Sequence, residues 1–562
     1  WEYLKEIVIL LEDNFSELFL PMLEDQLRQD IRIGHKVLNA LEEIAEALGI
    51  DFSHKKSLRL VEDLLREIIR YIGSLDDDPN NHFAQQYEAL GDLFKALLKV
   101  LQLIVEIIVS PATELRRLWL LFELALINVI GIIDDNVLRD GFDAINDQDY
   151  REWLQSHGAT ENVACSAPVR ALYSIYEAYP DGDTGDDNPT CLGDIAAGTA
   201  LHSALLTVFD YRGSVIWNLK ASAGDVLIAP LYQVLQQRGV KFEFFHTIKE
   251  IRPAADGLTI DEIIVDQQVT LRSGIETYNP LINVKGLPCW PNEPLYAQIE
   301  QGAALQAEDI DLESFWTPWQ PVNPDISLKQ GQDFDLVLLG ISVAALKTIC
   351  APLLDSTTNP YSYEQWQNMV NKIQTIQTQT FQLWLKPPLE ALGWPLASPA
   401  LGAYADPFSA GLDETPTLPV ENWPLGNIPQ NVTYFAAPLQ DPPHIPPPTD
   451  HSYPAQEFLR VRQAALDWLN AHIKHLWPTS IQNGTFNYNL LIDLNNGQGE
   501  ARFDAQYWRA NIDPSNRYVL AVKNSDQYRL KPDGSGFDNL YLVGDWDGKN
   551  DESNFQRASV TI

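Results

Sequence analysis

The first 150 residues carry apolar side chains at the three-and-four spacing of amphipathic helices. This spacing is plain in Tyr3–Leu11, Ile31–Leu48 and Leu58–Ile72. Two further stretches, Phe94–Val109 and Trp119–Ile133, are apolar almost all round, which is typical of buried helices. A packed core is the expected role of these two helices, and the alternative is a tunnel for a long lipophilic substrate. The pattern therefore predicts a helical region at the start of the chain.

From Gly224 onward the pattern alternates between helix and strand. The segment Gly224–Gly239 has helical spacing, and its last glycine suits the left-handed position after a helix. Lys241–Ile251 predicts a strand, and Asp261–Asp266 predicts its hairpin partner across a turn at Asp256–Gly257.

Two continuous apolar runs, Phe334–Gly340 and Leu540–Trp546, predict strands buried on both faces of a parallel sheet. A helix is expected to begin at Ser342, and another in Gln456–Leu476. Residues 387–455 are rich in proline and are expected to form an ordered but irregular loop. Strands interleaved with helices, beside a helical block, predict an α/β sheet domain and a helical domain.

The chain of 562 residues has 39 basic and 77 acidic residues, a formal net charge of −38. This balance disfavours a nucleic-acid surface and binding to anionic lipid through charge, and it favours solubility. The four cysteines form no CxxC pair, which predicts reduced thiols in a cytoplasmic protein. Peripheral membrane contact through the helical region stays an alternative. The chain starts at Trp1, so further native sequence is expected beyond both ends.

The strand Leu540–Trp546, with the sequence LYLVGDW, ends on a glycine and an aspartate. Ligands of open α/β sheets bind beyond the carboxyl ends of the strands. Gly544 allows a close approach of the backbone, and the Asp545 carboxylate suits a ribose or ribityl hydroxyl. The alternative is an ordinary strand and turn with an incidental aspartate, and the motif alone leaves both open.

Other candidate residues give weaker signals. His444 and His451 lie in the proline-rich stretch without converging ligands, so no metal site is expected. Lys285 is either a base or substrate contact or, as favoured, a surface lysine in a turn. No GxSxG elbow is present, and the sequence selects no catalytic residue. Three tryptophans either line a substrate channel or, as favoured, fill a domain interface: Trp290, Trp316 and Trp319.

The order of these elements resembles the FAD-dependent oxidoreductases of the flavin amine oxidase and phytoene desaturase superfamily. The likeness covers roughly residues 210–562, and it lies in GDVLIAPLYQVLQQRGVKF, KFEFFHTIKEI, FDLVLLGISVAAL and LYLVGDW. Phrases such as VKGLPCWPNEPLYAQI and LQDPPHIPPPTD resemble a bacterial and cyanobacterial NAD(P)/FAD-binding branch of unassigned function.

The resemblance implies a two-domain FAD-binding fold of the α/β class, with α+β elements and a large helical substrate-domain region. It implies a cap region (1–180), part of the FAD domain (181–275), a substrate-domain segment (276–333), the return strand and helix (334–350), the substrate domain (351–500) and the closing FAD segment (501–562). The implied cofactor is FAD, with Ile248 at the adenine and Gly544, Asp545, Trp546, Asn554 and Phe555 at the remaining cofactor.

The implied reaction is desaturation, dehydrogenation or double-bond isomerisation of a lipophilic substrate, either isoprenoid or carotenoid-like or fatty acyl. One alternative is a flavin amine oxidase, and another is a flavin-fold carrier or scaffold without cofactor. The GxGxxG segment of the Rossmann-like domain is absent from this chain, because GQG at 497–499 and GSG at 534–536 lack the third glycine. The acidic Asp551 and Glu552 also depart from the small-residue helix start usual after this strand.

Overall fold

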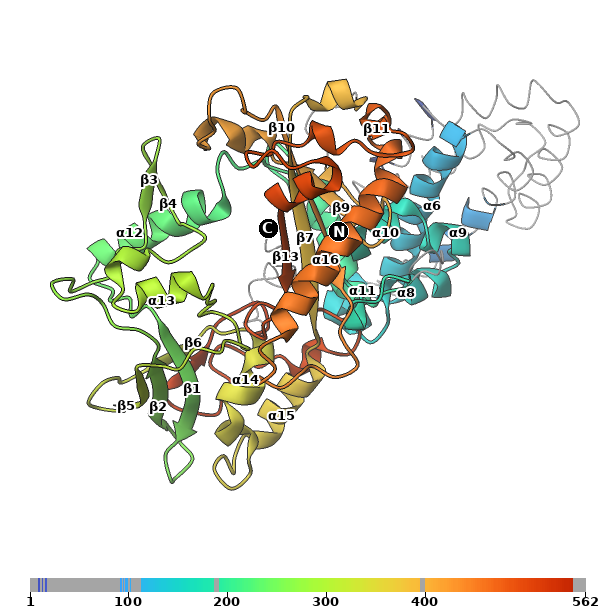
Figure 1. The fold of residues 1–562 in the computed structure, drawn as a ribbon. Coiled ribbons are helices and arrows are strands. Elements are labelled where there is room, and N and C mark those ends of the chain that lie inside the picture. The colour runs from blue at the N-terminus through green and yellow to red at the C-terminus, as the bar shows by residue number, and fades with distance from the viewer. Residues whose placement is uncertain are drawn as a thin grey trace, which may run out of the picture. The chain divides into compact units, whose positions relative to one another are not determined.

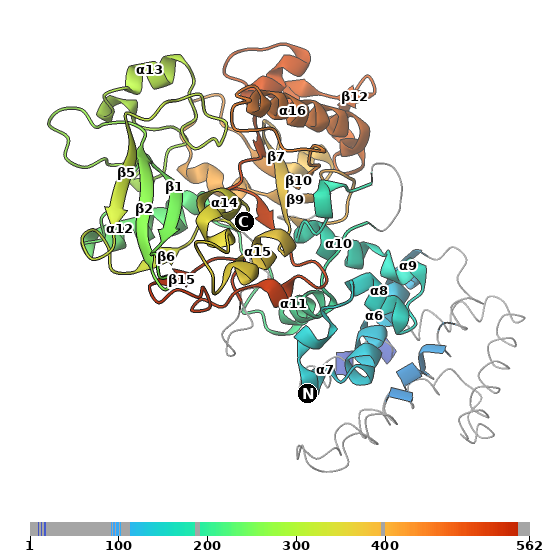
Figure 2. The same ribbon diagram turned by 90° about the horizontal axis from the view of Figure 1, so that it is seen from below.

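The computed structural model describes residues 9, 10, 13, 16, 17, 91, 92, 94, 95, 97–99, 102, 113–185, 192–394 and 400–548. The predicted helices Ile31–Leu48 and Leu58–Ile72, and most of Tyr3–Leu11 and Phe94–Val109, lie outside these residues. The chain divides into two compact units, Trp1–Leu172 with Ile195–Val215 and Tyr173–Asp194 with Ile216–Ile562. Figures 1 and 2 show their elements from two sides.

The described part of the first unit is helical. Its longest helix, α6 (Thr113–Asp134), confirms the helix predicted over Trp119–Ile133. The Trp153 indole is fully buried against α6, where it lies over Gly131 and donates a hydrogen bond of 2.7 Å to Asp135. The other helices are α7 (Val137–Asp140), α8 (Tyr150–Ser156), α9 (Glu161–Ala164) and α11 (Ala197–Phe209), and α10 (Ala167–Ile175) runs from this unit into the second.

The second unit contains a six-stranded antiparallel sheet in the order β13-β7-β10-β9-β8, with β14 also paired to β7. Its longest pairing joins β7 (Thr375–Leu385) to β10 (Asn431–Leu439), with Phe381 opposite Phe435. The prediction of irregular structure over residues 387–455 is therefore wrong, because a central strand of the sheet lies within that stretch. The remaining strands are β8 (Ala400–Leu401), β9 (Ala410–Asp413), β13 (Tyr507–Asn511) and β14 (Tyr518–Val519).

Alternation along β7 gives this sheet two different faces. Phe381 and Leu383 point to a core that they share with Trp468 and Leu469 of α16 (Tyr453–His472). Figure 1 shows this long helix running across β7 and β13, and it agrees with the helix predicted over Gln456–Leu476. Residues that pair across strands point to the same side of the sheet. Beside the apolar Ile376, Trp384, Ala436 and Pro438, the opposite face carries a set of mostly polar residues: Thr378, Thr380, Gln382, Tyr434, Tyr507, Arg509, Asn511 and Tyr518. We call this set the polar face.

A three-stranded antiparallel sheet, β1-β2-β5, is built from β1 (His246–Pro253), β2 (Ile260–Gln267) and β5 (Asn323–Lys329). The β1–β2 hairpin is confirmed, and Gly257 adopts the left-handed φ of 70° that its turn requires. The predicted strand over Lys241–Ile251 begins only at His246, because Phe245 has a φ of 60° and interrupts the extended chain.

The two apolar runs form a parallel pair, β6 (Val337–Leu339) beside β15 (Leu540–Leu542). One side of the pair is core, with Leu339 and Leu542 almost inaccessible. On the other side Leu338 is 73% exposed. The prediction of burial on both faces is therefore wrong here, because the described residues supply only two strands and cover one side. The uncovered side presents Leu336, Leu338, Tyr541 and Val543, which we call the outer face.

Short helices surround these strands. A π-helical turn (Gly224–Ile228) leads into α12 (Ala229–Gln237), and Gly239 follows in the left-handed region, as its place after a helix predicts. Helix α14 (Val343–Ile349) begins after Ser342, also as predicted. The remaining elements are α13 (Gly302–Ala307), α15 (Tyr363–Lys372), β3 (Ile282–Val284), β4 (Leu287–Cys289), β11 (Ile481–Gln482) and β12 (Thr485–Phe486).

The cysteines differ from the sequence expectation in one place. Cys289 and Cys350 are free thiols, and burial raises the pKa of the Cys350 thiol to about 12. Cys165 takes part in a disulfide, so the prediction of reduced thiols is wrong at this position. In the described part of the chain, no helix is both long and apolar enough to cross a membrane.

Candidate functional site

The parallel strands β6 and β15 end together in glycine. The main-chain N–H of Val543 donates a hydrogen bond of 3.0 Å to the Leu339 carbonyl, which keeps the two chains paired to their last residues. Gly340 and Gly544 come next. A Cβ on Gly340 would lie 3.6 Å from the Val543 carbonyl oxygen, an ordinary contact, whereas a Cβ on Gly544 would lie 2.6 Å from Nε1 of Trp546. Only glycine fits at 544 without displacing the indole.

A buried arginine holds the turn after β15. The Arg529 guanidinium donates to the Asp545 carbonyl oxygen at 2.5 Å, to the Asp526 carboxylate at 3.1 Å and to the Leu520 carbonyl at 3.2 Å. These bonds tie the arginine to the main chain of the turn and hold the Asp545 carbonyl in place. The turn is thus pre-organised by a charge-assisted network.

The turn also concentrates negative charge. Asp545 and Asp547 are both half-buried. Burial raises the pKa of Asp547, the neighbouring Asp545 charge adds to the rise, and the Gly544 backbone and Arg529 oppose it. A ligand group that donates hydrogen bonds, such as a hydroxyl, suits this turn better than an anionic group does.

The structure brings two of the expected cofactor residues, Trp546 and Ile248, to one hydrophobic core. Trp546 is 1% exposed and packs with Leu339 and Leu540, and Ile248 of β1 lies at the edge of the same core. Ile248 pairs with Val265, and the strand register shifts directly after it. Because the Trp546 indole is enclosed, the turn offers a ligand Gly544 and the half-buried Asp545. Asn554 and Phe555 lie outside the described residues.

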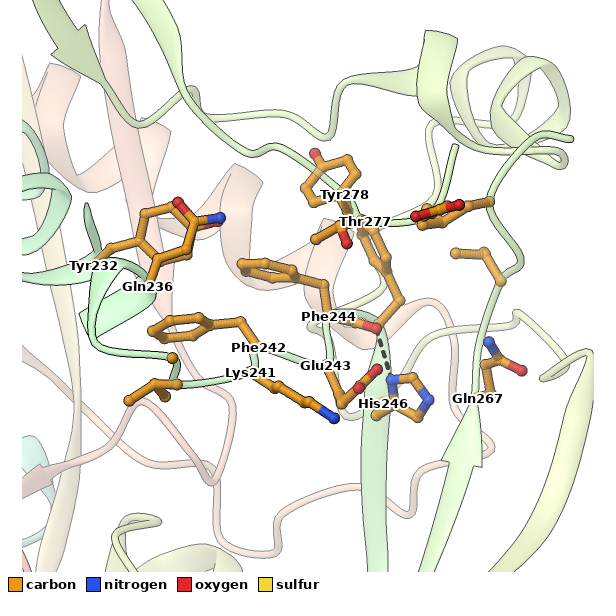
Figure 3. A pocket seen from close by; sticks show the side chains of 16 residues that line it. Tyr232, Gln236, Lys241, Phe242, Glu243, Phe244, His246, Gln267, Thr277 and Tyr278 are labelled. Atoms are coloured by element: carbon orange, nitrogen blue, oxygen red, sulfur yellow. Dashed lines mark hydrogen bonds between the residues drawn. The ribbon is translucent and has the colours of Figure 1, made fainter. Parts of the chain in front are cut away.

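A second candidate is an aromatic cavity of about 410 Å³ beside the start of β1, drawn in Figure 3. Its walls come from α12, from the segment Gly239–Phe245 and from residues 267–278. Tyr232 stands edge-on to Phe242 at 4.6 Å between ring centroids, and Phe244 stands edge-on to Tyr278 at 5.3 Å. Such edge-on contacts hold the rings in fixed positions along the cavity wall.

His246 supplies a polar group at the rim of this cavity. Its Nδ1 lies 2.7 Å from the Phe244 carbonyl oxygen, as the dashed line in Figure 3 shows. A carbonyl only accepts hydrogen bonds, so Nδ1 donates this one, and Nε2 is left for another partner. Ile248 follows two residues later, on the same side of β1. The cavity therefore lies next to Ile248, the residue that the family resemblance places at the adenine ring.

The cavity was not predicted as a site, although its signal is visible in the sequence. KFEFF places Phe242 and Phe244 on one side of an extended segment. The sequence did not show that Tyr232 and Tyr278, from a helix and a distant loop, meet these rings. Contacts between separate segments depend on tertiary structure, which periodicity does not report.

The other sequence candidates have structural roles. Lys285 sits in the β3–β4 turn and donates hydrogen bonds to the Pro419 and Glu421 carbonyls at 3.0 and 2.5 Å, in agreement with a turn lysine. His451 bonds the Trp316 carbonyl at 2.8 Å. Each of two indole N–H groups is bonded to a carbonyl, Trp316 to Pro446 and Trp319 to Gln268. Within the described ranges no three His, Cys, Asp or Glu side chains converge on a possible metal position.

Comparison with known proteins gives little further information. No protein-family model matches the chain, and no curated protein matches it. Among solved structures, an oxidoreductase from Methanosarcina mazei is matched with a TM-score of 0.40 and 12% sequence identity. The match covers 78% of this chain and 70% of that one. A likeness at this level assigns no family and identifies no reaction.

Proposed function

We propose that this chain belongs to an FAD-dependent oxidoreductase that acts on a small lipophilic substrate by hydride transfer to or from the flavin. Desaturation, dehydrogenation and double-bond isomerisation are the reactions in this class. The observation that carries the proposal is the shared ending of β6 and β15, where Gly340 and Gly544 lie at the carboxyl ends of parallel strands and Asp545 follows. Ligands of α/β sheets bind at such strand ends.

The residues at the turn fit parts of an FAD molecule. Gly544 gives the backbone room to approach a ligand, and the Asp545 carboxylate accepts hydrogen bonds from ribityl or ribose hydroxyls. The aromatic cavity suits an adenine ring, with the His246 Nε2 atom as an acceptor for its exocyclic amine. When bound, FAD would supply the hydride chemistry, and the protein would supply orientation and electrostatics.

The outer face of the β6–β15 pair supports the same proposal. Parallel sheets are nearly always covered on both faces. Here Leu336 and Leu338 are exposed on one strand, and Tyr541 and Val543 on the other. The helices of a glycine-rich dinucleotide-binding segment that joined this sheet would pack on this face and bury them. The exposed apolar residues therefore favour a larger FAD domain over a sheet that is complete with two strands.

The proposal is tested by FAD affinity in two matched variants of the full-length protein. Asp538 and Asp545 lie at opposite ends of β15, and the Asp538 side chain is exposed. Loss of a hydrogen bond to a charged group costs about 1.5–3 kcal/mol, so Asp545→Ala should weaken FAD binding roughly ten- to hundredfold. Asp538→Ala should leave it unchanged. Equal affinities in the two variants would remove Asp545 from the cofactor site.

Experiment distinguishes this function from two others. A flavin amine oxidase would share the cofactor site and differ in accepting an amine. A carrier or scaffold without cofactor would bind no FAD in wild-type protein, whatever residue stands at 545. We propose a small-molecule substrate and no nucleic-acid partner, since a net charge of −38 disfavours the extended basic surface that a nucleic-acid backbone requires.

A further inference from the structure

Glu177 occupies an unusual position directly after helix α10. Its φ of 47° lies in the left-handed region, where a residue with a side chain costs about 1–2 kcal/mol more than glycine. Hydrogen bonds on both sides hold this conformation, with the Ala178 N–H bonded to the Tyr173 carbonyl at 2.8 Å and the Tyr179 N–H to the Glu177 carbonyl at 2.7 Å. Strain of this kind is found at functional sites, although it is not sufficient to identify one.

The segment after Glu177 is fastened to the six-stranded sheet. The short 3₁₀ turn Pro180–Gly182 packs against β7 and β10, and the Asp441 N–H donates to the Asp181 carbonyl at 2.9 Å. Any Cβ on Gly182 would overlap the Leu439 carbonyl. The approach of the two chains is therefore close, and the position of Glu177 over the sheet is fixed by main-chain contacts.

One oxygen of the Glu177 carboxyl is enclosed without a hydrogen-bond partner. The residue as a whole is half-buried, but its Oε2 atom is shielded from solvent and makes no hydrogen bond to any described residue. Burial raises the pKa of Glu177 to about 8. A buried oxygen without a partner is destabilising in either protonation state, since the acid lacks an acceptor and the carboxylate lacks a donor. A ligand can supply the missing partner.

Two tyrosines of the polar face lie near this carboxyl. Burial, followed by the negative charge of Glu177, raises the pKa of Tyr434 on β10 and of Tyr518 on β14. Tyr507 and Glu414 also raise the pKa of Tyr434. Asp545 and Tyr176 raise the pKa of Tyr518. Tyr518 thus experiences the charge of Glu177 and that of Asp545, the aspartate of the proposed cofactor turn.

We propose that Glu177 is the proton-exchanging residue of a ligand site on the polar face, with Tyr434 and Tyr518 as neighbouring hydrogen-bonding groups. The proposal rests on the oxidoreductase function proposed above and assigns a residue to its proton. Dehydrogenation removes a hydride from one substrate carbon and a proton from the adjacent atom, and the electron pair that the proton leaves forms the new double bond. When bound, FAD would accept the hydride with its two electrons. The proton goes to the Glu177 carboxylate, which becomes the neutral acid. In the reverse reaction, reduction of the double bond, the acid gives the proton back to the substrate.

A general acid–base group is most effective when its pKa lies near the working pH. With a pKa of about 8, both forms of Glu177 are populated around neutral pH, whereas an ordinary glutamate is almost wholly ionised. The ligand expected here has an apolar body and one hydroxyl, amine or carbonyl that meets Oε2.

The first test is independent of flavin. Infrared difference spectra of the full-length protein, titrated from neutral to alkaline pH, follow the C=O band of protonated carboxyls. A carboxyl that ionises near pH 8 is expected in wild type and should be absent in Glu177→Gln. The matched control is Glu414→Gln, which removes another carboxyl beside Tyr434 and should keep the transition. If Glu177→Gln does not fold, Glu177→Asp should fold and show a displaced midpoint.

The second test asks whether a ligand reaches Oε2. 1-Octanol and n-octylamine serve as probes with the same apolar chain, and binding of either should move the midpoint of the Glu177 transition. A band that survives Glu177→Gln, or a midpoint that neither probe moves, overturns the proposal. A colourless protein that keeps the transition and its response to a probe rejects the flavin function while retaining the proton-exchanging site.

Discussion

Gly340 and Gly544 follow the ends of two paired parallel strands but differ in the space around them. A Cβ on Gly340 would make an ordinary contact of 3.6 Å with the Val543 carbonyl oxygen, whereas a Cβ on Gly544 would press on the Trp546 indole at 2.6 Å. Gly544 is therefore required by the packing of the protein itself. The packing of the protein does not require glycine at 340, so a close approach of a ligand is the remaining reason for a glycine there.

This difference predicts opposite outcomes for two alanine variants. Gly544→Ala should lower the free energy of unfolding by about 1–3 kcal/mol, since the buried indole must shift. Gly340→Ala should change stability by no more than about 0.5 kcal/mol but weaken FAD binding. Thermal unfolding and FAD titration of both variants check this, and full FAD affinity in Gly340→Ala would exclude a close approach of the cofactor at that strand end.

The outer face gives a prediction about the full-length protein. Leu338 is 73% exposed and Leu425 is 94% exposed. If a dinucleotide-binding segment covers the outer face, Leu338→Lys should remove about 1.5–3 kcal/mol of buried leucine stabilisation, while Leu425→Lys changes stability by about 0.5 kcal/mol at most. Chemical denaturation measures both. Two equally harmless substitutions would show that the outer face is truly solvent-exposed.

In the helical unit, Gly131 is predicted to resist a substitution that usually stabilises helices. Alanine in place of a helical glycine ordinarily adds up to about 1 kcal/mol. At Gly131 the added methyl would overlap the Trp153 ring, so Gly131→Ala should instead destabilise by about 1–3 kcal/mol. The loss should be smaller in a Trp153→Phe background, whose ring is smaller. A stabilised Gly131→Ala protein would contradict this packing.

Glu177 predicts a specific dependence of stability on pH. Its pKa is raised from 4.5 to about 8, so between these values the folded protein keeps a proton that the unfolded chain has lost. This contribution makes stability fall as pH rises through that window, by up to about 1.4 kcal/mol per pH unit. Glu177→Gln should flatten the slope and gain stability relative to wild type towards pH 8. Parallel slopes in the two proteins would mean that Glu177 is ionised in the fold.

The sequence predicted local elements better than their surroundings. Alternating apolar residues predicted the β1–β2 hairpin, and a capping residue predicted the helix after Ser342. Continuous apolar stretches predicted the strands β6 and β15. The exposure of Leu338 was not predictable from the sequence. A continuous apolar run shows that a strand favours burial on both faces, but it does not show whether other segments pack on those faces.

The central sheet was missed for physical reasons. In β7, TIQTQTFQLWL, buried polar residues such as Gln377 and Thr378 break the apolar pattern by which a strand is recognised. In β10, the surrounding prolines concealed a strand that pairs along its whole length with β7. Glu177 carries no local signal, since its isolation arises from a loop that folds onto the distant polar face.

The most direct test of the proposed function is the flavin content of the natively purified full-length protein. We expect visible flavin absorption bands, and release on denaturation of a yellow compound identified as FAD by mass spectrometry, close to one per chain. A colourless protein that also fails to bind added FAD would contradict it, and would leave the strand ends of Gly340 and Gly544 without the role proposed for them.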